Sequence, residues 1–209
     1  MPFISIILII AAALFAAAFF YVSRIISSLP KGRAEEQLQI QDSTNKKLIA
    51  CIGDSLTHGN IGQSWVDYLR NEFPNDIFLN EGINGNTVWQ VLQRVEPLIA
   101  CKPDIIVILI GSNDALGSFD KASGQRYKRN YNLPEAPTFE KYKDQLLELI
   151  EKLSDVSKVA LCTIPPVGEN RDSPINNHVR QFNEFIKFAA EQKMYIYCQY
   201  LIIFGLTSL

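Results

Sequence analysis

The chain has 209 residues, of which 47% are hydrophobic and 20% are charged, so it is long enough for one domain of ordinary size and an appendage. Its formal net charge of -2 gives no electrostatic support for a nucleic-acid partner. The four cysteines form neither a Cys-x-x-Cys pair nor a cluster with histidine. This argues against a structural zinc site and favours buried thiols over disulfides.

The N-terminal segment is apolar. Residues 2–22 carry no charged side chain, and a helix of this length can cross a bilayer. We predict a transmembrane anchor over residues 1–24, giving a single-pass membrane protein. A cleaved signal peptide is the alternative, although the run is long for one and no Lys or Arg precedes it. Arg24, Lys31 and Arg33 follow the run, which by the positive-inside rule leaves the domain in the cytoplasm. Many tethered enzymes face outward, so the side of the membrane stays open.

Residues 25–46 are mostly polar and are interpreted as a stalk. The domain is predicted over residues 47–209, where apolar runs alternate with helical patterns. The runs predict buried strands over residues 47–53, 76–82, 104–111, 158–166 and 194–204. The helices between them have start signals at Ser64, Thr87, Thr138 and Ser173–Pro174. This alternation predicts a three-layer α/β/α domain with a parallel five-stranded sheet.

No glycine-rich phosphate loop follows the first predicted strand, so no nucleotide or flavin cofactor is expected. Three strand ends do carry polar residues, namely Gly53-Asp54-Ser55, the stretch 80–87 and the stretch 111–114. Ligands of such sheets bind outside the carboxyl ends of the strands, so we expect these residues to meet at one edge.

An acyl-transfer site needs a nucleophilic hydroxyl, donors aimed at the oxyanion and a base. Ser55 can supply the hydroxyl and, through its backbone N–H, one donor. Gly85 can offer a second backbone N–H, and the side-chain amide of Asn113 can offer a third donor. Asp54 and Asp114 are interpreted as supporting residues that hold turns by accepting backbone N–H bonds.

The blocks "GDSLT", "NGNT" and "GSND", in this order at strand ends, resemble the first three sequence blocks of the SGNH hydrolases, also called GDSL esterases and lipases. The resemblance covers roughly residues 46–200. It implies a flavodoxin-like sheet and hydrolysis of esters, with Ser55 as nucleophile and Ser55, Gly85 and Asn113 as the oxyanion hole. The substrate would be an acyl ester, a lysophospholipid or an O-acetyl group.

The family also has an Asp-x-x-His pair after the last strand, in which His is the general base. This chain has two histidines, His58 beside the serine and His178 before the final strand, and neither fits that spacing. We predict that the domain is C-terminally incomplete, through truncation or an altered reading frame. His58 or His178 could stand in as the base. The alternative is a catalytically silent product that at most binds ligand.

The segment 118–137 is long for a connection and contains Tyr127, Tyr131 and four basic residues, Lys121, Arg126, Lys128 and Arg129. We interpret it as a lid or substrate-recognition loop over the site, with anionic head groups as contacts. A solvated loop is the alternative. Trp65 and Trp89 are interpreted as core residues rather than as the lining of an acyl pocket.

Overall fold

The computed structural model describes residues 2–39, 46–60, 62–192 and 196–198. Its centre is a parallel sheet with the strand order β2-β1-β3-β4-β5. The strands are β1 (Leu48–Gly53), β2 (Ile77–Gly82), β3 (Ile105–Leu109), β4 (Lys158–Cys162) and β5 (Ile196–Cys198). This order is that of flavodoxin-like doubly wound sheets. In these sheets β2 is added on one side of β1 and the later strands on the other, so the order of strand addition reverses between β1 and β3. The predicted α/β fold with a parallel sheet is confirmed. The rest of the predicted last strand, residues 194–204, lies largely outside the described residues.

The register brings the carboxyl ends of the first three strands to one level. Gly53 of β1 pairs with Gly82 of β2 on one side and with Leu109 of β3 on the other. The residues that follow these three strands therefore leave the sheet side by side. This is the edge at which the sequence placed its candidate site.

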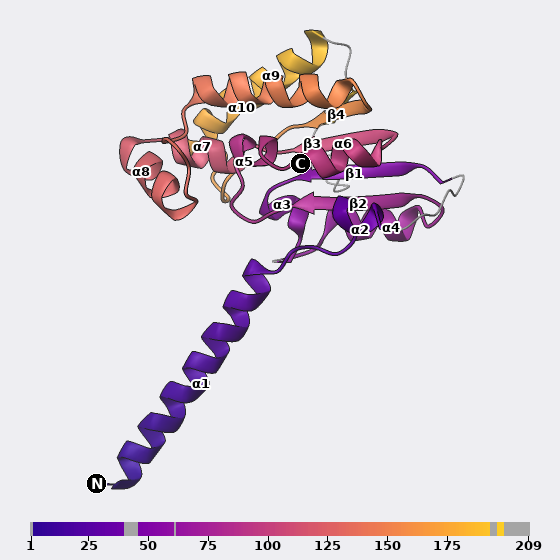
Figure 1. The fold of residues 1–209 in the computed structure, drawn as a ribbon. Coiled ribbons are helices and arrows are strands. Elements are labelled where there is room, and N and C mark those ends of the chain that lie inside the picture. Colours follow the sequence, from indigo (N-terminus) through magenta and orange to yellow (C-terminus); the bar gives the residue numbers. More distant parts are fainter. Residues whose placement is uncertain (1, 40–45, 61, 193–195, 199–209) are drawn as a thin grey trace.

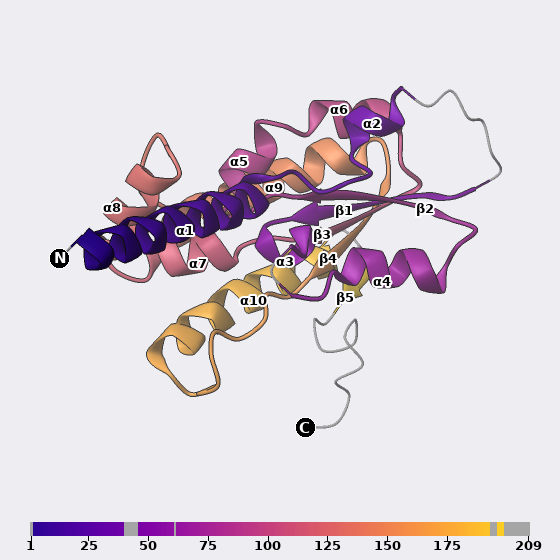
Figure 2. The same cartoon turned by 90° about the horizontal axis from the view of Figure 1, so that it is seen from below.

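Alternate strand residues face two apolar clusters, one on each side of the sheet. One cluster contains Ile52, Ile106 and Ile108 and is covered by α5 (Val88–Leu92), α6 (Glu96–Cys101), α9 (Phe139–Ser154) and α10 (Pro174–Gln192). The other contains Ile49, Cys51 and Phe78, which pack against Trp65 and Val66 of α4 (Trp65–Glu72). Figures 1 and 2 show the helices on both sides of the sheet. The cysteines Cys51 and Cys101 are free thiols, as expected, and burial raises the pKa of the Cys51 thiol.

The predicted helix starts at Ser64, Thr87 and Thr138 are confirmed. The hydroxyl of Ser64 accepts a hydrogen bond from the backbone N–H of Asp67 at 3.1 Å, and that of Thr138 accepts one from Lys141 at 3.2 Å. Thr87 forms a capping box with Gln90. Each cap satisfies a backbone donor that the first helical turn leaves unpaired.

The segment 118–137 differs from its prediction as one long loop. It contains the end of α7 (Ser112–Ser118) and all of α8 (Lys121–Asn130). The carboxylate of Asp120 accepts the backbone N–H of Ser123 at 2.8 Å and so begins α8. Gly124 and Tyr127 are buried on one face of α8, and the other face of the helix is exposed to solvent. A short amphipathic helix with one glycine gave too weak a periodic signal to be predicted.

The N-terminal apolar segment forms helix α1 (Pro2–Ser27), which projects from the domain (Figure 1). Its stretch Ile7–Ser27 has a mean hydropathy of 2.1, and none of it is buried in the protein. The predicted N-terminal hydrophobic helix is therefore present. Its length and composition fit a membrane span and a signal peptide equally.

Part of the predicted stalk, residues 25–46, packs on the domain. The carbonyl of Gly32 accepts the backbone N–H of Asn80 on the free edge of β2 at 2.9 Å, and the carbonyl of Lys31 accepts from Arg70 at 3.1 Å. Ala34 begins the short helix α2 (Ala34–Gln37) and is buried against α6 and β2. The interpretation of these residues as a free stalk did not anticipate this packing, because composition carries no information on tertiary contacts. Residues 40–45 lie outside the described residues.

Candidate active site

Ser55 is the first residue of helix α3 (Ser55–His58), directly beyond the carboxyl end of β1. Its side chain is exposed, while the carboxylate of Asp54 caps the helix by accepting the backbone N–H of Leu56 at 3.0 Å. The approach of α3 to the sheet is close, because a Cβ at Gly82 would lie 2.0 Å from the backbone nitrogen of His58. Only glycine leaves room for this contact. The strand, turn and helix therefore present the Ser55 hydroxyl at the edge of the sheet.

The side chain of Asn113 joins the Ser55 turn to the loop after β2. Its Nδ2 donates to the carbonyl of Asn86 at 3.0 Å and to Oδ2 of Asp54 at 3.3 Å. Its Oδ1 accepts a hydrogen bond from the hydroxyl of Tyr127 at 3.2 Å. Asn113 is buried and has partners for both ends of its amide. These bonds bring the turn that precedes Ser55, the loop that holds Gly85 and the start of α7 together.

Gly85 has a left-handed backbone with φ of +77°, and a Cβ at this position would lie 2.0 Å from the ring of Tyr131. The conformation and the contact both favour glycine. The sequence analysis placed Tyr127 and Tyr131 in a lid or recognition segment over the site. It gave neither side chain a contact with Asn113 or Gly85.

Asp54 and Asp114 are both buried, and both make the contacts of turn-holding residues. The carboxylate of Asp114 accepts the backbone N–H of Val88, the first residue of α5, at 3.2 Å. Burial raises the pKa of Asp54 to about 6 and that of Asp114 to about 7, the latter with a smaller contribution from the charge of Asp54. Backbone hydrogen bonds partly oppose both shifts.

A buried ion-pair network lies behind the loop after β2, and no sequence motif indicated it. Glu81 is 3% exposed, and its Oε2 lies 2.8 Å from Arg33 and 3.2 Å from Arg94. Its Oε1 accepts the backbone N–H of Ala34 at 2.7 Å. Burial lowers the pKa of Arg94 to about 10, and the charge of Glu81 opposes this shift. The network ties the segment before the domain to the end of β2.

Arg94 also connects this network to the site. Its Nε donates to the side chain of Asn86 at 2.9 Å, and its Nη2 donates to the backbone carbonyl of Glu81 at 2.8 Å. A longer bond of 3.4 Å reaches the carbonyl of Gly53. Since Asn86 follows Gly85 and accepts from Asn113, Arg94 holds the loop that carries the predicted oxyanion donor.

Neither histidine is hydrogen-bonded to Ser55 within the described part of the chain. His58 is buried on α3, where desolvation lowers its pKa and the neighbouring Asn84 side chain partly offsets this shift. Nε2 of His178 lies 2.9 Å from the hydroxyl of Ser118, and its ring packs against Phe182. Burial lowers the pKa of His178 as well. Across residues 2–39, 46–60, 62–192 and 196–198, no cluster of three His, Cys, Asp or Glu residues could hold a metal ion.

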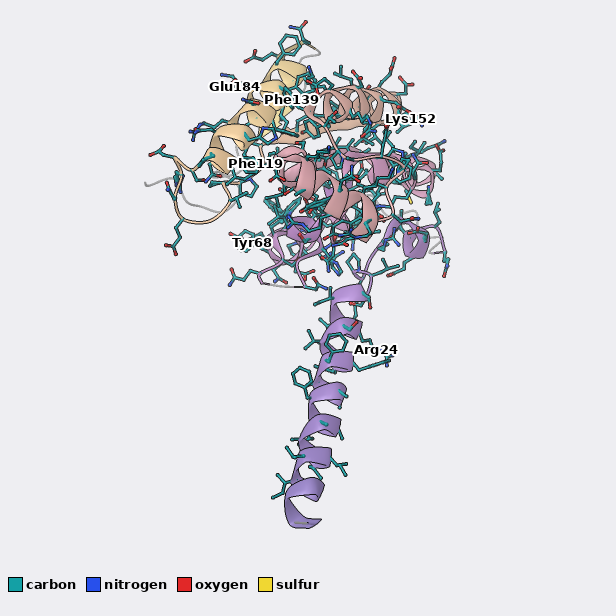
Figure 3. All side chains as sticks on the ribbon, turned by 90° about the vertical axis from the view of Figure 1, so that its left-hand side faces the viewer. Arg24, Tyr68, Phe119, Phe139, Lys152 and Glu184 are labelled. Carbon is teal, nitrogen blue, oxygen red and sulfur yellow. The ribbon has the colours of Figure 1, made fainter. Side chains whose placement is uncertain are left out.

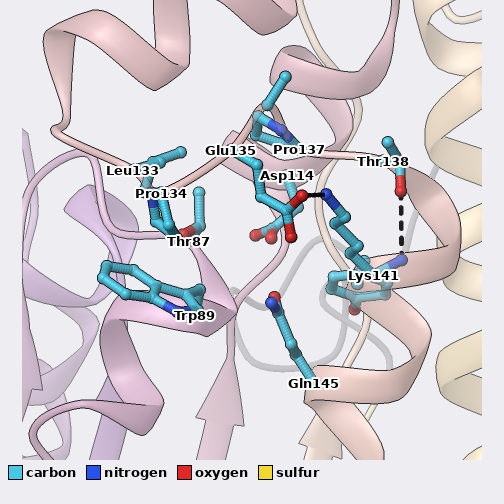
Figure 4. A pocket seen from close by; sticks show the side chains of 12 residues that line it. Thr87, Trp89, Asp114, Leu133, Pro134, Glu135, Pro137, Thr138, Lys141 and Gln145 are labelled. Carbon is cyan, nitrogen blue, oxygen red and sulfur yellow. Dashed lines mark hydrogen bonds and ion pairs between the residues drawn. The ribbon is translucent and has the colours of Figure 1, made fainter.

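A pocket with an empty volume of about 300 Å³ lies between α5, α9 and the segment that joins α8 to α9 (Figure 4). Asp114 and Trp89 line it, and Ser55 does not. The expectation that Trp89 is a core residue therefore differs from the structure, in which this side chain is half-buried at the pocket. Trp65 is 2% exposed and belongs to the core, as expected.

Comparison with known proteins agrees with this geometry. Residues 51–201 match the GDSL-like lipase/acylhydrolase family, and the chain belongs to this family. The resemblance drawn from the three sequence blocks is thereby confirmed. No match was found among curated proteins.

Two acetylxylan esterases are among the solved structures that share the fold. Axe2, an acetylxylan esterase from Geobacillus stearothermophilus, superposes with a TM-score of 0.63 at 24% sequence identity, over 81% of this chain and 84% of that chain. The acetyl xylan esterase AlAXEase superposes with a TM-score of 0.60 at 18% identity, over 73% of this chain and 76% of that one. Axe2 has also been solved as catalytic mutants in which a serine, an aspartate or a histidine is replaced by alanine.

Proposed function

We propose that this protein is a membrane-tethered hydrolase of ester bonds in which Ser55 is the nucleophile. The observation that carries the proposal is the exposed Ser55 hydroxyl at the start of α3, at the same sheet edge as Gly85 and Asn113. Membership in the GDSL-like family supports the reaction class. The long apolar helix α1 supports the tether, because its whole candidate span is exposed rather than packed in a protein core.

In this reaction, Oγ of Ser55 attacks the carbonyl carbon of the ester and its proton passes to a base. The electron pair of the carbonyl moves onto its oxygen, which accepts hydrogen bonds from the backbone N–H groups of Ser55 and Gly85 and from Nδ2 of Asn113. The bond from Asn113 to Asp54, at 3.3 Å the longer of its two, is the one that exchanges for the oxyanion. Collapse of the intermediate expels the alcohol, which takes up the proton. Water then hydrolyses the acyl-enzyme.

We propose that one of the chain's two imidazoles, His58 or His178, takes the proton, because no other histidine is present in the sequence. The catalytic mutants of Axe2, in which serine, aspartate and histidine are replaced, support a histidine as the base on this fold. The second candidate function is that of a catalytically silent protein with this fold that at most binds ligand. The absence of a hydrogen bond from Ser55 to His58 or His178, both within the described part of the chain, favours this second candidate.

Two observations bear on the substrate class, and they favour different substrates. The acetylxylan esterases with the same fold favour an O-acetyl group, while α1 favours an acyl ester or a lysophospholipid in a membrane. A short ester such as p-nitrophenyl acetate is accessible to either kind of site and therefore tests the reaction before the substrate.

The deciding experiment compares hydrolysis of p-nitrophenyl acetate by the full chain in detergent with that by its Ser55→Ala variant. We expect the full chain to hydrolyse the ester and the variant to lose this activity. Without a base, a serine site retains only roughly 10³ to 10⁴-fold acceleration over water, so single-turnover measurement is required. The matched control is Ser154→Ala at the end of α9, where the serine hydroxyl donates to the carbonyl of Glu151, and this variant should leave hydrolysis unchanged. If the full chain and Ser55→Ala are equally silent although both are folded, the catalytically silent protein is the correct reading.

A further inference from the structure

The exposed face of α8 carries a patch of cations. Its buried stripe consists of Gly124 and Tyr127, and the latter touches the site through Asn113. The opposite face carries Lys121, Arg126, Lys128 and Arg129, all exposed. None of these four forms an ion pair with another residue that the structure describes. The basic face of α8 is therefore free to bind an anionic partner while its buried face contacts the site.

The C-terminal end of α1 is bonded to the loops of the same site. The last carbonyls of a helix have no partner within the helix. Here Nδ2 of Asn60 donates to the carbonyl of Ile25 at 2.8 Å, and Nδ2 of Asn84 donates to that of Ile26 at 2.7 Å. Asn84 directly precedes Gly85, and its Nδ2 also lies 3.2 Å from Oδ1 of Asn60. The end of α1 is thus attached to the loops that follow β1 and β2.

The chain after α1 remains attached to the domain. The carbonyls of Lys31 and Gly32 bond to α4 and β2, and Arg33 enters the buried network with Glu81. These contacts orient α1 with respect to the domain, which a flexible stalk would not do. Figures 1 and 2 both show α1 leaving the domain toward the end at which α7 and α8 lie. A bilayer around α1 would therefore lie on the side of the domain that carries α8.

We propose that the basic face of α8 binds anionic phospholipid head groups and holds the Ser55 edge of the sheet against the bilayer in which α1 is anchored. Basic residues near a membrane surface are attracted to anionic lipids over about one Debye length. The four cations of α8 match this charge, and the direction of α1 supplies the proximity. Where the substrate is concerned, the inference rests on the proposed function, since an ester carried by a lipid of that leaflet would then reach Ser55.

The test places an environment-sensitive fluorophore on α8 of the full chain, through Gln125→Cys, and reconstitutes the protein in phospholipid vesicles. A label at Glu184→Cys, on α10 at the end of the domain remote from α1 (Figure 3), is the matched control site. The unsubstituted chain is carried through the same labelling as the blank. The vesicles contain phosphatidylcholine alone or phosphatidylcholine with phosphatidylglycerol.

We expect a blue-shifted and stronger emission at position 125 in the vesicles with phosphatidylglycerol. The shift should disappear in 1 M salt, where the Debye length falls to about 3 Å, and when the four basic residues of α8 are all changed to glutamine. The label at position 184 should show no shift. Equal emission at the two positions would overturn the proposal. So would a shift at position 125 that is the same in vesicles with and without phosphatidylglycerol.

A separate measurement distinguishes this inference from the proposed function. The full chain in the same vesicles is assayed with p-nitrophenyl acetate and with a lysophosphatidylglycerol incorporated in the bilayer. Loss of both activities refutes the proposed function and leaves the fluorescence result as the test of lipid binding. If the soluble ester is hydrolysed and the lipid ester is not, the substrate inference is overturned and the proposed hydrolase activity stands. The same holds if changing the four basic residues of α8 leaves hydrolysis of the lipid ester unchanged.

Discussion

Two regions at one edge of the sheet surround buried carboxyl groups in different ways. At β2, Glu81 is surrounded by Arg33 and Arg94 and accepts the backbone N–H of Ala34. At α7, Asp114 accepts the backbone N–H of Val88, and burial raises its pKa to about 7. The first carboxylate forms ion pairs that connect segments distant in sequence. The second is a buried group whose charge is unfavourable, so the two regions should respond differently to mutation and to pH.

The largest effect is expected for Arg94→Met, which removes an ion pair with Glu81 and the bond to Asn86. Removing one partner of a buried ion pair costs about 3 to 5 kcal/mol. Urea unfolding in detergent, followed by tryptophan fluorescence, measures this loss. Arg171→Met is the control, because Arg171 is exposed, and its midpoint should stay close to that of the unsubstituted chain. Equal midpoints for the two variants would show that the network does not stabilise the fold.

The next effect is a dependence of stability on pH. Folding raises the pKa of Asp114 from an ordinary value near 3.8 to about 7, so the protonated form is favoured in the folded state. Its contribution is complete below about pH 4 and is lost as the pH rises through 7, by up to about 4 kcal/mol. Asp54, with a pKa of about 6, adds a smaller fall over the lower part of this range.

Asp114→Asn tests this assignment because its side chain stays neutral. The free energy of unfolding of the variant should fall less between pH 4 and pH 8 than that of the unsubstituted chain. Asp144→Asn, at an exposed position of α9, is the control and should leave the pH profile as it is. A profile that Asp114→Asn does not flatten would assign the pH dependence to other groups.

Arg33→Met tests whether the segment before the domain belongs to it. Glu81 keeps Arg94 in this variant, and the bonds of Arg94 to Asn86 and to the Glu81 carbonyl remain, so we expect a smaller loss than for Arg94→Met, roughly 2 to 3 kcal/mol. Thermal unfolding of the full chain measures it. Lys31→Met is the matched control, since Lys31 is exposed and its backbone carbonyl, which accepts from Arg70, stays in place. If Arg33→Met and Lys31→Met unfold at the same temperature, the segment behaves as a free stalk after all.

Gly85→Ala separates backbone strain from crowding. The new Cβ would meet the ring of Tyr131, so we expect a loss of about 2 kcal/mol, of which about 1 comes from the left-handed conformation. Gly168→Ala is the control for strain alone, because Gly168 has a φ of +65° and nothing lies within 4 Å of its added Cβ. Urea unfolding of both variants gives the difference. Equal losses would mean that Tyr131 moves away at little cost.

The smallest effect is expected for Tyr127→Phe, which removes the hydrogen bond to Oδ1 of Asn113. The loss should be about 1 kcal/mol in stability. Because the bond orients the amide of a proposed oxyanion donor, kcat for p-nitrophenyl acetate should fall more than KM changes. Tyr131→Phe keeps its ring over Gly85 and should leave both parameters unchanged. Identical kinetics for the two variants would remove Tyr127 from the positioning of Asn113.

The sequence predicted best those features that depend on residues close together along the chain. The apolar runs predicted the strands, and Ser64, Thr87 and Thr138 predicted helix starts, because caps act within one turn. The glycine, serine and asparagine blocks identified the family because each follows a strand that ends at the same edge. Helix α8 was missed, since its apolar stripe of Gly124 and Tyr127 is too short to give a periodic signal.

The sequence by itself therefore determined the alternation of strands and helices, the apolar N-terminal helix and the family. Only the tertiary structure placed Arg33 and Arg94 on Glu81, Tyr127 on Asn113 and Asn84 on the end of α1. The physical reason is range. Propensity, capping and periodicity act over a few neighbouring residues, whereas a buried charge takes as its partner whichever group the fold brings within reach. The partners of Glu81 lie 48 and 13 residues away along the chain, and no local pattern connects them.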